Sequence, residues 1–225
     1  NKIDNKISIK NYNASYKGKN NIKIFIIDDL VYGIDSKANF NIYHLENGKL
    51  SNSVNLQNNY QDIKLIPTSF SKYYENFIIG FKSGLILMID KKGELIWEFK
   101  YNDILSTPIK IIDDNIIILF SDTIISVSIN NSKENWSAKY EGKKIIKSNG
   151  GITSQFANLI YFILPNSYVG EYDTLLGQKN ISKFSDINFK NSLNNSEQNL
   201  HIYKNFLVYY DGQSKLSTYD IFSDE

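Results

Sequence analysis

Short runs of apolar residues recur along this chain in pairs, and each pair ends in a small polar turn. β-branched and aromatic residues dominate these runs, as is typical of strands. The five pairs occupy residues 30–32 and 41–44, 77–79 and 88–90, 116–118 and 128–130, 159–161 and 171–173, and 206–208 and 218–220. Measured between their last residues, the pairs are 46, 40, 43 and 47 residues apart. A period of this length filled by strands predicts the four-stranded blades of a β-propeller.

Each repeat reads as four strands joined by short turns, so it must stack on its neighbours to bury its faces. The predicted blades span residues 22–56, 63–100, 107–140, 151–181 and 197–220, and the last lacks a fourth strand. One further strand is expected at residues 6–16. The sequence therefore predicts a single all-β propeller domain over residues 1–225, with about 4.5 to 5 four-stranded antiparallel blades.

Pairs that contain at least one Asp or Asn stand just before the second strand of each repeat, where a tight hairpin turn is expected. These pairs are Asp28-Asp29, Glu75-Asn76, Asp114-Asn115, Ala157-Asn158 and Lys204-Asn205. Asn and Asp tolerate positive φ and bond their own backbone, as such turns require. The acidic pairs Asp28-Asp29 and Asp113-Asp114 could be read as carboxylates for acid–base catalysis, but their equivalent turn positions favour solvated turn residues.

Composition narrows the function classes. With 42% hydrophobic residues, 22% charged residues and a net charge of +1, the chain has no electrostatic bias toward nucleic acid or anionic membranes. It contains no cysteine, which excludes thiol catalysis, cysteine metal ligands and disulfides. No apolar run approaches the roughly 18 residues of a membrane helix. Residues 1–4 show neither a methionine nor a signal-peptide pattern, so we expect a processed or truncated beginning.

Few side chains suggest catalytic or metal chemistry. His44 and His201 fall in different predicted blades and have no neighbours at metal-ligand spacing. Trp97 and Trp136 stand at similar points of consecutive fourth strands, where we predict packing between blades, with ligand stacking as the alternative. Nucleophile-elbow, phosphate-loop and dinucleotide motifs are absent from the sequence. We therefore expect no catalytic residues, no metal site and no cofactor.

The segment at residues 84–97 resembles the repeat of pyrroloquinoline-quinone-type propellers, whose strands end in an Asp, a Gly-containing turn and a Trp. Here these residues are Asp90, Gly93 and Trp97, with an Asp-to-Trp interval one residue shorter than usual. The order of the linkers at 105–109, 136–156, 177–182 and 204–208 further resembles the BamB family of outer-membrane-protein assembly factors. That resemblance implies an eight-bladed ring, of which this chain would form an incomplete open arc.

The resemblance also implies a binding site. Members of the family bind the periplasmic domains of the barrel-assembly protein BamA through a hydrophobic-x-hydrophobic-basic segment and a pair of acidic residues on an adjacent loop. Carried over, these positions are Lys144, Ile145, Ile146 and Lys147, followed by Asn195 and Glu197. Lys144 replaces an apolar residue and Asn195 an acidic one. Two isoleucines between lysines in a loop are typical of an exposed interaction patch, although both could instead pack between blades.

The function implied is a non-enzymatic scaffold at the periplasmic face of the bacterial outer membrane. Its expected partners are a BamA-like protein and unfolded outer-membrane proteins, and nucleic acid is not expected. Membrane association would depend on a lipid anchor that is not present in this chain, because the family's lipid-accepting cysteine is absent. The alternatives are a quinone-dependent dehydrogenase-like propeller, which would need a calcium site and commonly a vicinal disulfide, and a generic propeller adaptor.

Overall fold

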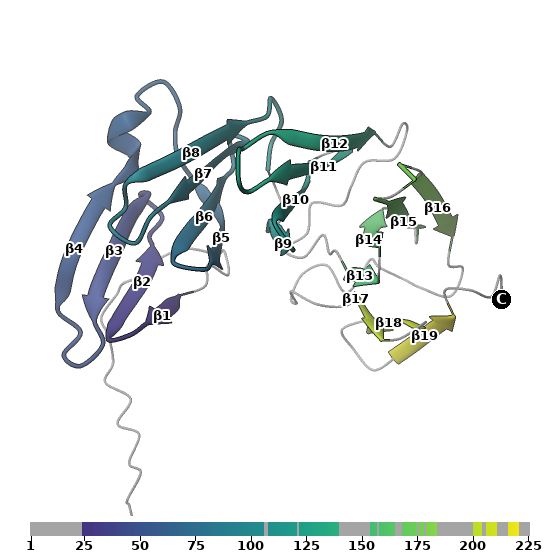
Figure 1. The fold of residues 1–225 in the computed structure, drawn as a ribbon, viewed down its shortest axis with the longest axis horizontal. Coiled ribbons are helices and arrows are strands. Elements are labelled where there is room, and N and C mark those ends of the chain that lie inside the picture. Colours follow the sequence, from purple (N-terminus) through teal and green to yellow (C-terminus); the bar gives the residue numbers. More distant parts are fainter. Residues whose placement is uncertain are drawn as a thin grey trace, which may run out of the picture.

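The computed structural model describes residues 24–105, 108–120, 122–139, 154–156, 158–164, 168–174, 176–177, 179–183, 200–203, 206–210 and 216–220. Within these ranges the chain forms nineteen strands in five antiparallel sheets, numbered here 1 to 5 in chain order (Figure 1). Strands pair with their neighbours in sequence, so every sheet is a simple meander.

Sheets 1 to 4 have four strands each and sheet 5 has three. Sheet 1 contains β1 (Phe25–Ile27), β2 (Leu30–Ile34), β3 (Asn39–His44) and β4 (Leu50–Asn55), and is followed by the 3₁₀ helix η1 (Leu56–Asn59). Sheet 2 contains β5 (Pro67–Tyr73), β6 (Asn76–Phe81), β7 (Leu85–Ile89) and β8 (Leu95–Lys100). Sheet 3 contains β9 (Lys110–Ile112), β10 (Asn115–Leu119), β11 (Thr123–Ser128) and β12 (Glu134–Lys139). Sheet 4 contains β13 (Ser154–Phe156), β14 (Leu159–Leu164), β15 (Tyr168–Asp173) and β16 (Lys179–Lys183), and sheet 5 contains β17 (Leu200–Tyr203), β18 (Phe206–Tyr210) and β19 (Leu216–Asp220).

Two-residue turns join the first and second strands of sheets 1 to 3. Ile27 pairs with Leu30 across the turn Asp28-Asp29, and Asp28 has a φ of 53°. In sheets 2 and 3 the turns are Tyr74-Glu75 and Asp113-Asp114, one residue earlier than predicted, because Asn76 and Asn115 are already paired as the first residues of β6 and β10. Tyr74 and Asp113 have φ values of 50° and 51°. The first residue of each of these three turns is therefore in the left-handed region.

The core lies between the sheets. Side chains alternate between the two faces of a strand, so sheets 2 and 3 each contribute to two clusters. In β6, Phe77 and Ile79 are buried against sheet 1, whereas Ile78 is buried against sheet 3. A third cluster joins sheets 3 and 4 through Ile117 and Ile160. Sheets 2 and 3 thus each have a backward face, toward the preceding sheet, and a forward face, toward the following one.

The sheets follow one another along an arc (Figure 1). Strands β1, β5 and β9 lie on its inner side, and β4, β8 and β12 lie on its outer rim. Sheet 1 and sheet 5 lie at opposite ends and the sheets do not close into a ring. The predicted all-β fold of four-stranded antiparallel sheets in an open arc is therefore confirmed. The strand predicted at residues 6–16 lies outside the described residues.

Candidate functional site

The predicted binding residues all fall in segments that the structure does not describe. Lys144, Ile145, Ile146 and Lys147 lie between β12 and β13, and Asn195 and Glu197 lie between β16 and β17. Both predicted segments therefore connect consecutive sheets in the chain order. Their role as a partner-binding site stays a prediction.

The two tryptophans lie between sheets, as predicted. The Nε1–H of Trp97, on β8 of sheet 2, donates a hydrogen bond to the backbone carbonyl oxygen of Ile129 beyond β11, at 2.7 Å. Trp136, on β12 of sheet 3, stacks on Tyr172 of sheet 4 with ring centroids 4.0 Å apart. Sheets 2 and 3 each contact the following sheet through a tryptophan on the fourth strand.

A polar contact on the hairpin turns also crosses from sheet 2 to sheet 3. The hydroxyl of Tyr73 donates a hydrogen bond to Oδ1 of Asp114 at 2.5 Å. This hydrogen bond raises the pKa of Tyr73 to about 12, because ionising the phenol would place two negative charges together. Asp114 is thus a turn residue and a hydrogen-bond acceptor for the neighbouring sheet, which agrees with the structural interpretation of the acidic pairs.

An exposed ion pair joins two turns of sheet 2, Lys91 on the turn between β7 and β8 and Glu75 on the turn between β5 and β6. Nζ of Lys91 lies 3.0 Å from Oε2 of Glu75, and the two side chains are 53% and 63% exposed. The hydrogen bond to Glu75 raises the pKa of Lys91, and the carboxylate of Asp28 on sheet 1 acts in the same direction. Exposed pairs of this kind contribute little stability, so their main effect is on the surface charge of the hairpin ends.

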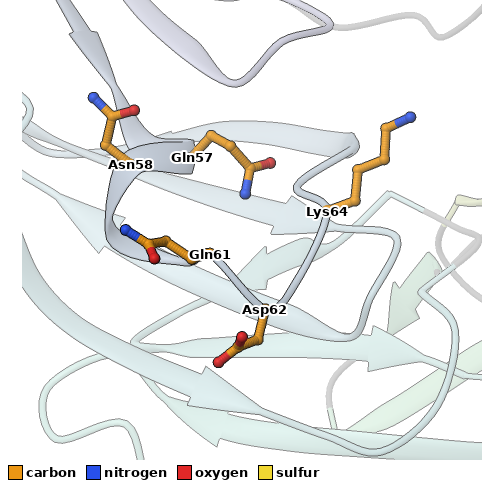
Figure 2. Close-up of a pocket in the computed structure, with 5 residues that line it drawn as sticks. All are labelled: Gln57, Asn58, Gln61, Asp62 and Lys64. Atoms are coloured by element: carbon orange, nitrogen blue, oxygen red, sulfur yellow. The ribbon is translucent and has the colours of Figure 1, made fainter.

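A shallow hollow of about 570 Å³ lies beside the link between sheets 1 and 2. It is lined by Gln57, Asn58, Gln61, Asp62 and Lys64 (Figure 2). Figure 2 shows these side chains pointing in different directions rather than toward a common centre. Ligand pockets usually have largely apolar walls with a few polar groups that converge on the ligand. This hollow is lined by polar and charged residues that do not converge.

Gln57 organises the link itself. Its Nε2 donates hydrogen bonds to the carbonyl oxygens of Tyr60 and Ile63, at 2.6 and 2.8 Å, and its Oε1 accepts one from the N–H of Leu65 at 2.8 Å. The hydroxyl of Tyr60 then donates to Oε2 of Glu98 on β8, and burial together with this hydrogen bond raises the pKa of Tyr60. The amide of Gln57 is thus committed to the backbone, which makes it a structural residue of the loop.

Other kinds of site find little support in the described ranges. Across them, no three His, Asp or Glu side chains are grouped so that they could hold a metal ion. Nor does that part of the chain contain a helix long and apolar enough to cross a membrane. Lys110, on the inner strand β9, is half-buried, and burial lowers its pKa.

Comparison with known proteins adds the fold and no more. No protein-family model matches the chain, and no curated protein matches its sequence. Among solved structures, BamB from Moraxella catarrhalis is similar over 89% of this chain, with a TM-score of 0.63 and 12% sequence identity. The computationally designed Ika8 protein is similar over 88% of the chain, with a TM-score of 0.62 and 14% identity. The fold is a partial β-propeller. The chain spans only 58% and 57% of the lengths of these two structures.

Sequence reasoning missed one class of candidate interaction residues in this propeller. Large apolar side chains are exposed on its sheets, among them Leu50 at 54%, Leu95 at 50% and Leu216 at 65%. In sequence they look like the strand residues that are buried elsewhere. Leu50 and Leu95 are the first residues of β4 and β8, and this shared repeat position is a signal that could have identified both.

Proposed function

We propose that this chain is a non-enzymatic scaffold that holds partner proteins on the surface of its stacked sheets. The observation that carries the proposal is how the conspicuous polar and aromatic groups are used. Trp97 and Trp136 join sheets, Gln57 holds a loop, and Asp114 accepts a hydrogen bond from the next sheet. These four side chains are thus occupied in holding sheets and a loop in place, which favours a rigid platform.

The platform is suited to binding proteins because a rigid repeat array presents many turns and linkers at fixed positions. Repeat proteins use such extended surfaces for recognition, and binding residues are disproportionately found on loops held by a rigid scaffold. The exposed ion pair of Lys91 and Glu75 and the exposed ring of Tyr74 lie on such turns. Binding to a protein surface does not require a deep pocket, so the proposal is compatible with the shallow hollow beside the link between sheets 1 and 2.

The more specific proposal concerns the assembly machinery of outer-membrane β-barrels. We infer that the chain acts at the periplasmic face of the outer membrane, binds BamA-type periplasmic domains and assists the insertion of outer-membrane proteins. Two observations support this role: the linker resemblance to the BamB family and the similarity of the fold to BamB from Moraxella catarrhalis. The predicted contact segments are residues 144–147 together with Asn195 and Glu197.

A pull-down with the periplasmic domains of the BamA-type partner tests this role. The double variant Ile146→Asp and Lys147→Glu is expected to lose at least about tenfold in affinity, because it removes an apolar anchor and reverses a charge. The matched control, Ile96→Asp with Lys92→Glu, makes the same chemical changes at exposed positions of sheet 2 and should bind like the wild type.

Two results would contradict the proposal at different levels. Equal binding by the double variant and the wild type would reject the site, whereas no binding by the wild type would reject the partner. Titration with pyrroloquinoline quinone and Ca²⁺ tests the non-enzymatic assignment separately. Saturable, tight binding of the quinone would favour a dehydrogenase over a scaffold.

A further inference from the structure

The residue that opens the turn between the first and second strands can be compared across sheets 1 to 3. Its φ is positive in all three, at 53° for Asp28, 50° for Tyr74 and 51° for Asp113. Aspartate tolerates this conformation because its short side chain can bond the local backbone, whereas a bulky residue there is a conformational outlier. Sheet 2 therefore carries a tyrosine at a position where the sheets on either side carry the better suited residue.

Burial of the ring does not offset this unfavourable backbone. The side chain of Tyr74 is 77% exposed, the largest value among the exposed large hydrophobic side chains of the described residues. Sheet 2 is packed between sheets 1 and 3, so this exposure does not arise at an end of the arc. Backbone strain that is retained without a gain in packing is typical of functional positions.

Neighbouring contacts hold the ring of Tyr74 in place. It packs edge-to-face on Tyr73, with ring centroids 4.7 Å apart and an interplanar angle of 76°. Tyr73 is itself bound to Asp114 of sheet 3 by its hydroxyl, and Glu75, the other residue of the turn, is paired with Lys91. Because the turn is fixed on both sides, a contact through the ring would cost little conformational entropy.

The charges around the ring indicate what it would bind. The turns Asp28-Asp29 and Asp113-Asp114, on the two neighbouring sheets, present four exposed carboxylates. The turn of sheet 1 is near that of sheet 2, because Asp28 contributes to the raised pKa of Lys91, whose own charge is offset by Glu75. The face of an aromatic ring also attracts the cationic groups of lysine and arginine. The ring and the carboxylates therefore favour the same class of ligand, a cation.

We propose that Tyr74 is an aromatic anchor that binds lysine or arginine side chains in a basic segment of a partner protein. Tyrosine is enriched among the residues that carry most of the energy of protein interfaces, and the flanking carboxylates would attract and orient the segment. This surface is formed by turns within sheets, whereas residues 144–147 lie in a link between sheets. The inference rests on the scaffold role proposed above and adds the chemistry of a partner.

The variant Tyr74→Asn separates a binding role from a structural one. It leaves the net charge unchanged, and asparagine tolerates positive φ. The relief of strain should balance or exceed the lost contact with Tyr73, so we expect a melting temperature between the wild-type value and about 4 °C above it. Thermal unfolding measures this. A melting temperature several degrees below that of the wild type would show that the ring supports the fold, and it would overturn the proposal.

Titration with a fluorescently labelled hexalysine peptide, followed by anisotropy at low salt, measures binding. Tyr74→Asn is expected to weaken binding about two- to fivefold, as the loss of an exposed cation–π contact should. Tyr74→Phe keeps the ring and should bind like the wild type. The matched control, Tyr203→Asn, removes a ring that is 66% exposed on β17 of sheet 5, and it should leave binding unchanged.

Three results of the titration would overturn the proposal: equal binding by the wild type and Tyr74→Asn, an equal loss in the Tyr203→Asn control, or wild-type binding to hexaglutamate as tight as to hexalysine. The titration contains no BamA-type domain, so its failure is distinct from a failure of the pull-down. A scaffold that binds those domains but shows no dependence on Tyr74 would keep the proposed function and lose this anchor.

Discussion

Two neighbouring interfaces, between sheets 1 and 2 and between sheets 2 and 3, bury equivalent positions with different types of side chain. In the first, the ring of Phe77 lies within 4.9 to 6.0 Å, centroid to centroid, of Phe25, Tyr32, Phe40 and Phe70. In the second, the equivalent residue is Ile116, which packs in a cluster dominated by isoleucine. Both Phe77 and Ile116 are 0% exposed. The position in the repeat therefore determines whether a side chain is buried. The type of side chain that fills that position differs from one interface to the next.

The two interfaces also differ in their directional contacts. Sheets 2 and 3 are joined by hydrogen bonds from Trp97 to Ile129 and from Tyr73 to Asp114. At the first interface the turn at Gly93 lies so close to sheet 1 that an added Cβ would come 2.8 Å from Cγ2 of Val54. The first interface thus depends on ring packing and close approach, and the second combines aliphatic packing with polar contacts that fix its geometry.

Removing the central ring should have the largest effect. Phe77→Ala is expected to lower the free energy of unfolding by about 3–5 kcal/mol, and Ile116→Ala by about 2–5 kcal/mol, with Phe77→Ala the larger because four rings lose a partner. Urea unfolding of both variants measures the difference. A greater loss for Ile116→Ala would show that the ring cluster has no special weight.

Overfilling the first interface should cost somewhat less. Gly93→Ala is expected to lower the free energy of unfolding by about 1–3 kcal/mol, because the new methyl group meets Val54 and Phe40 at a residue whose φ is 89°. Thermal unfolding checks this. Gly177→Ala is the matched control: its φ is 66°, but among the described residues its Cβ would approach only the hydroxyl of Tyr172, at 3.9 Å. Equal losses would assign the effect to the backbone alone.

Removing the indole donor tests the polar contribution to the second interface. Trp97→Phe keeps a ring between the sheets but deletes the hydrogen bond to the Ile129 carbonyl, so we expect a loss of about 0.5–1.5 kcal/mol. Trp136→Phe should lose less, because its described contact is the stack on Tyr172, which phenylalanine can keep. Chemical denaturation of the two variants compares them, and a larger loss for Trp136→Phe would contradict this account.

The smallest effect is expected from Tyr73→Phe, and it should depend on pH. The pKa of Tyr73 is raised from 10.0 to about 12, so its hydrogen bond to Asp114 stabilises the fold fully below pH 10 and loses its effect as the pH rises through about 12. The stability difference between wild type and variant should therefore be constant from pH 7 to about 9 and then shrink. A difference that grows at alkaline pH would contradict the assignment.

Much of this architecture could be predicted from the sequence because strands and turns leave local signals. The turn positions were less certain. Asn76 and Asn115 resemble turn residues, yet each begins a strand, while Tyr74 adopts a left-handed φ that a tyrosine rarely takes. The physical reason is that cross-strand pairing fixes the turn, and it overrides the preference of a single residue.

The faces of the strands were harder to predict than the strands themselves. β6 and β7 are buried on both sides, so they show no alternation of apolar and polar residues. Val31 and Ile116 are both apolar strand residues at equivalent repeat positions, yet Val31 is half-buried and Ile116 is fully buried. The predicted contact segment at 144–147 lies outside the described residues, so its role is a matter for the binding experiment.

The central claim is that equivalent repeat positions are buried only where another sheet covers them. The direct test removes the same atoms at two such positions. Val31→Ala is compared with the step from Ile116→Val to Ile116→Ala, each by urea unfolding. We predict a loss below about 1 kcal/mol at position 31 and about 2 kcal/mol or more at position 116, since each buried methylene contributes about 0.8 kcal/mol before the cavity is counted. Equal losses at the two positions would contradict the account.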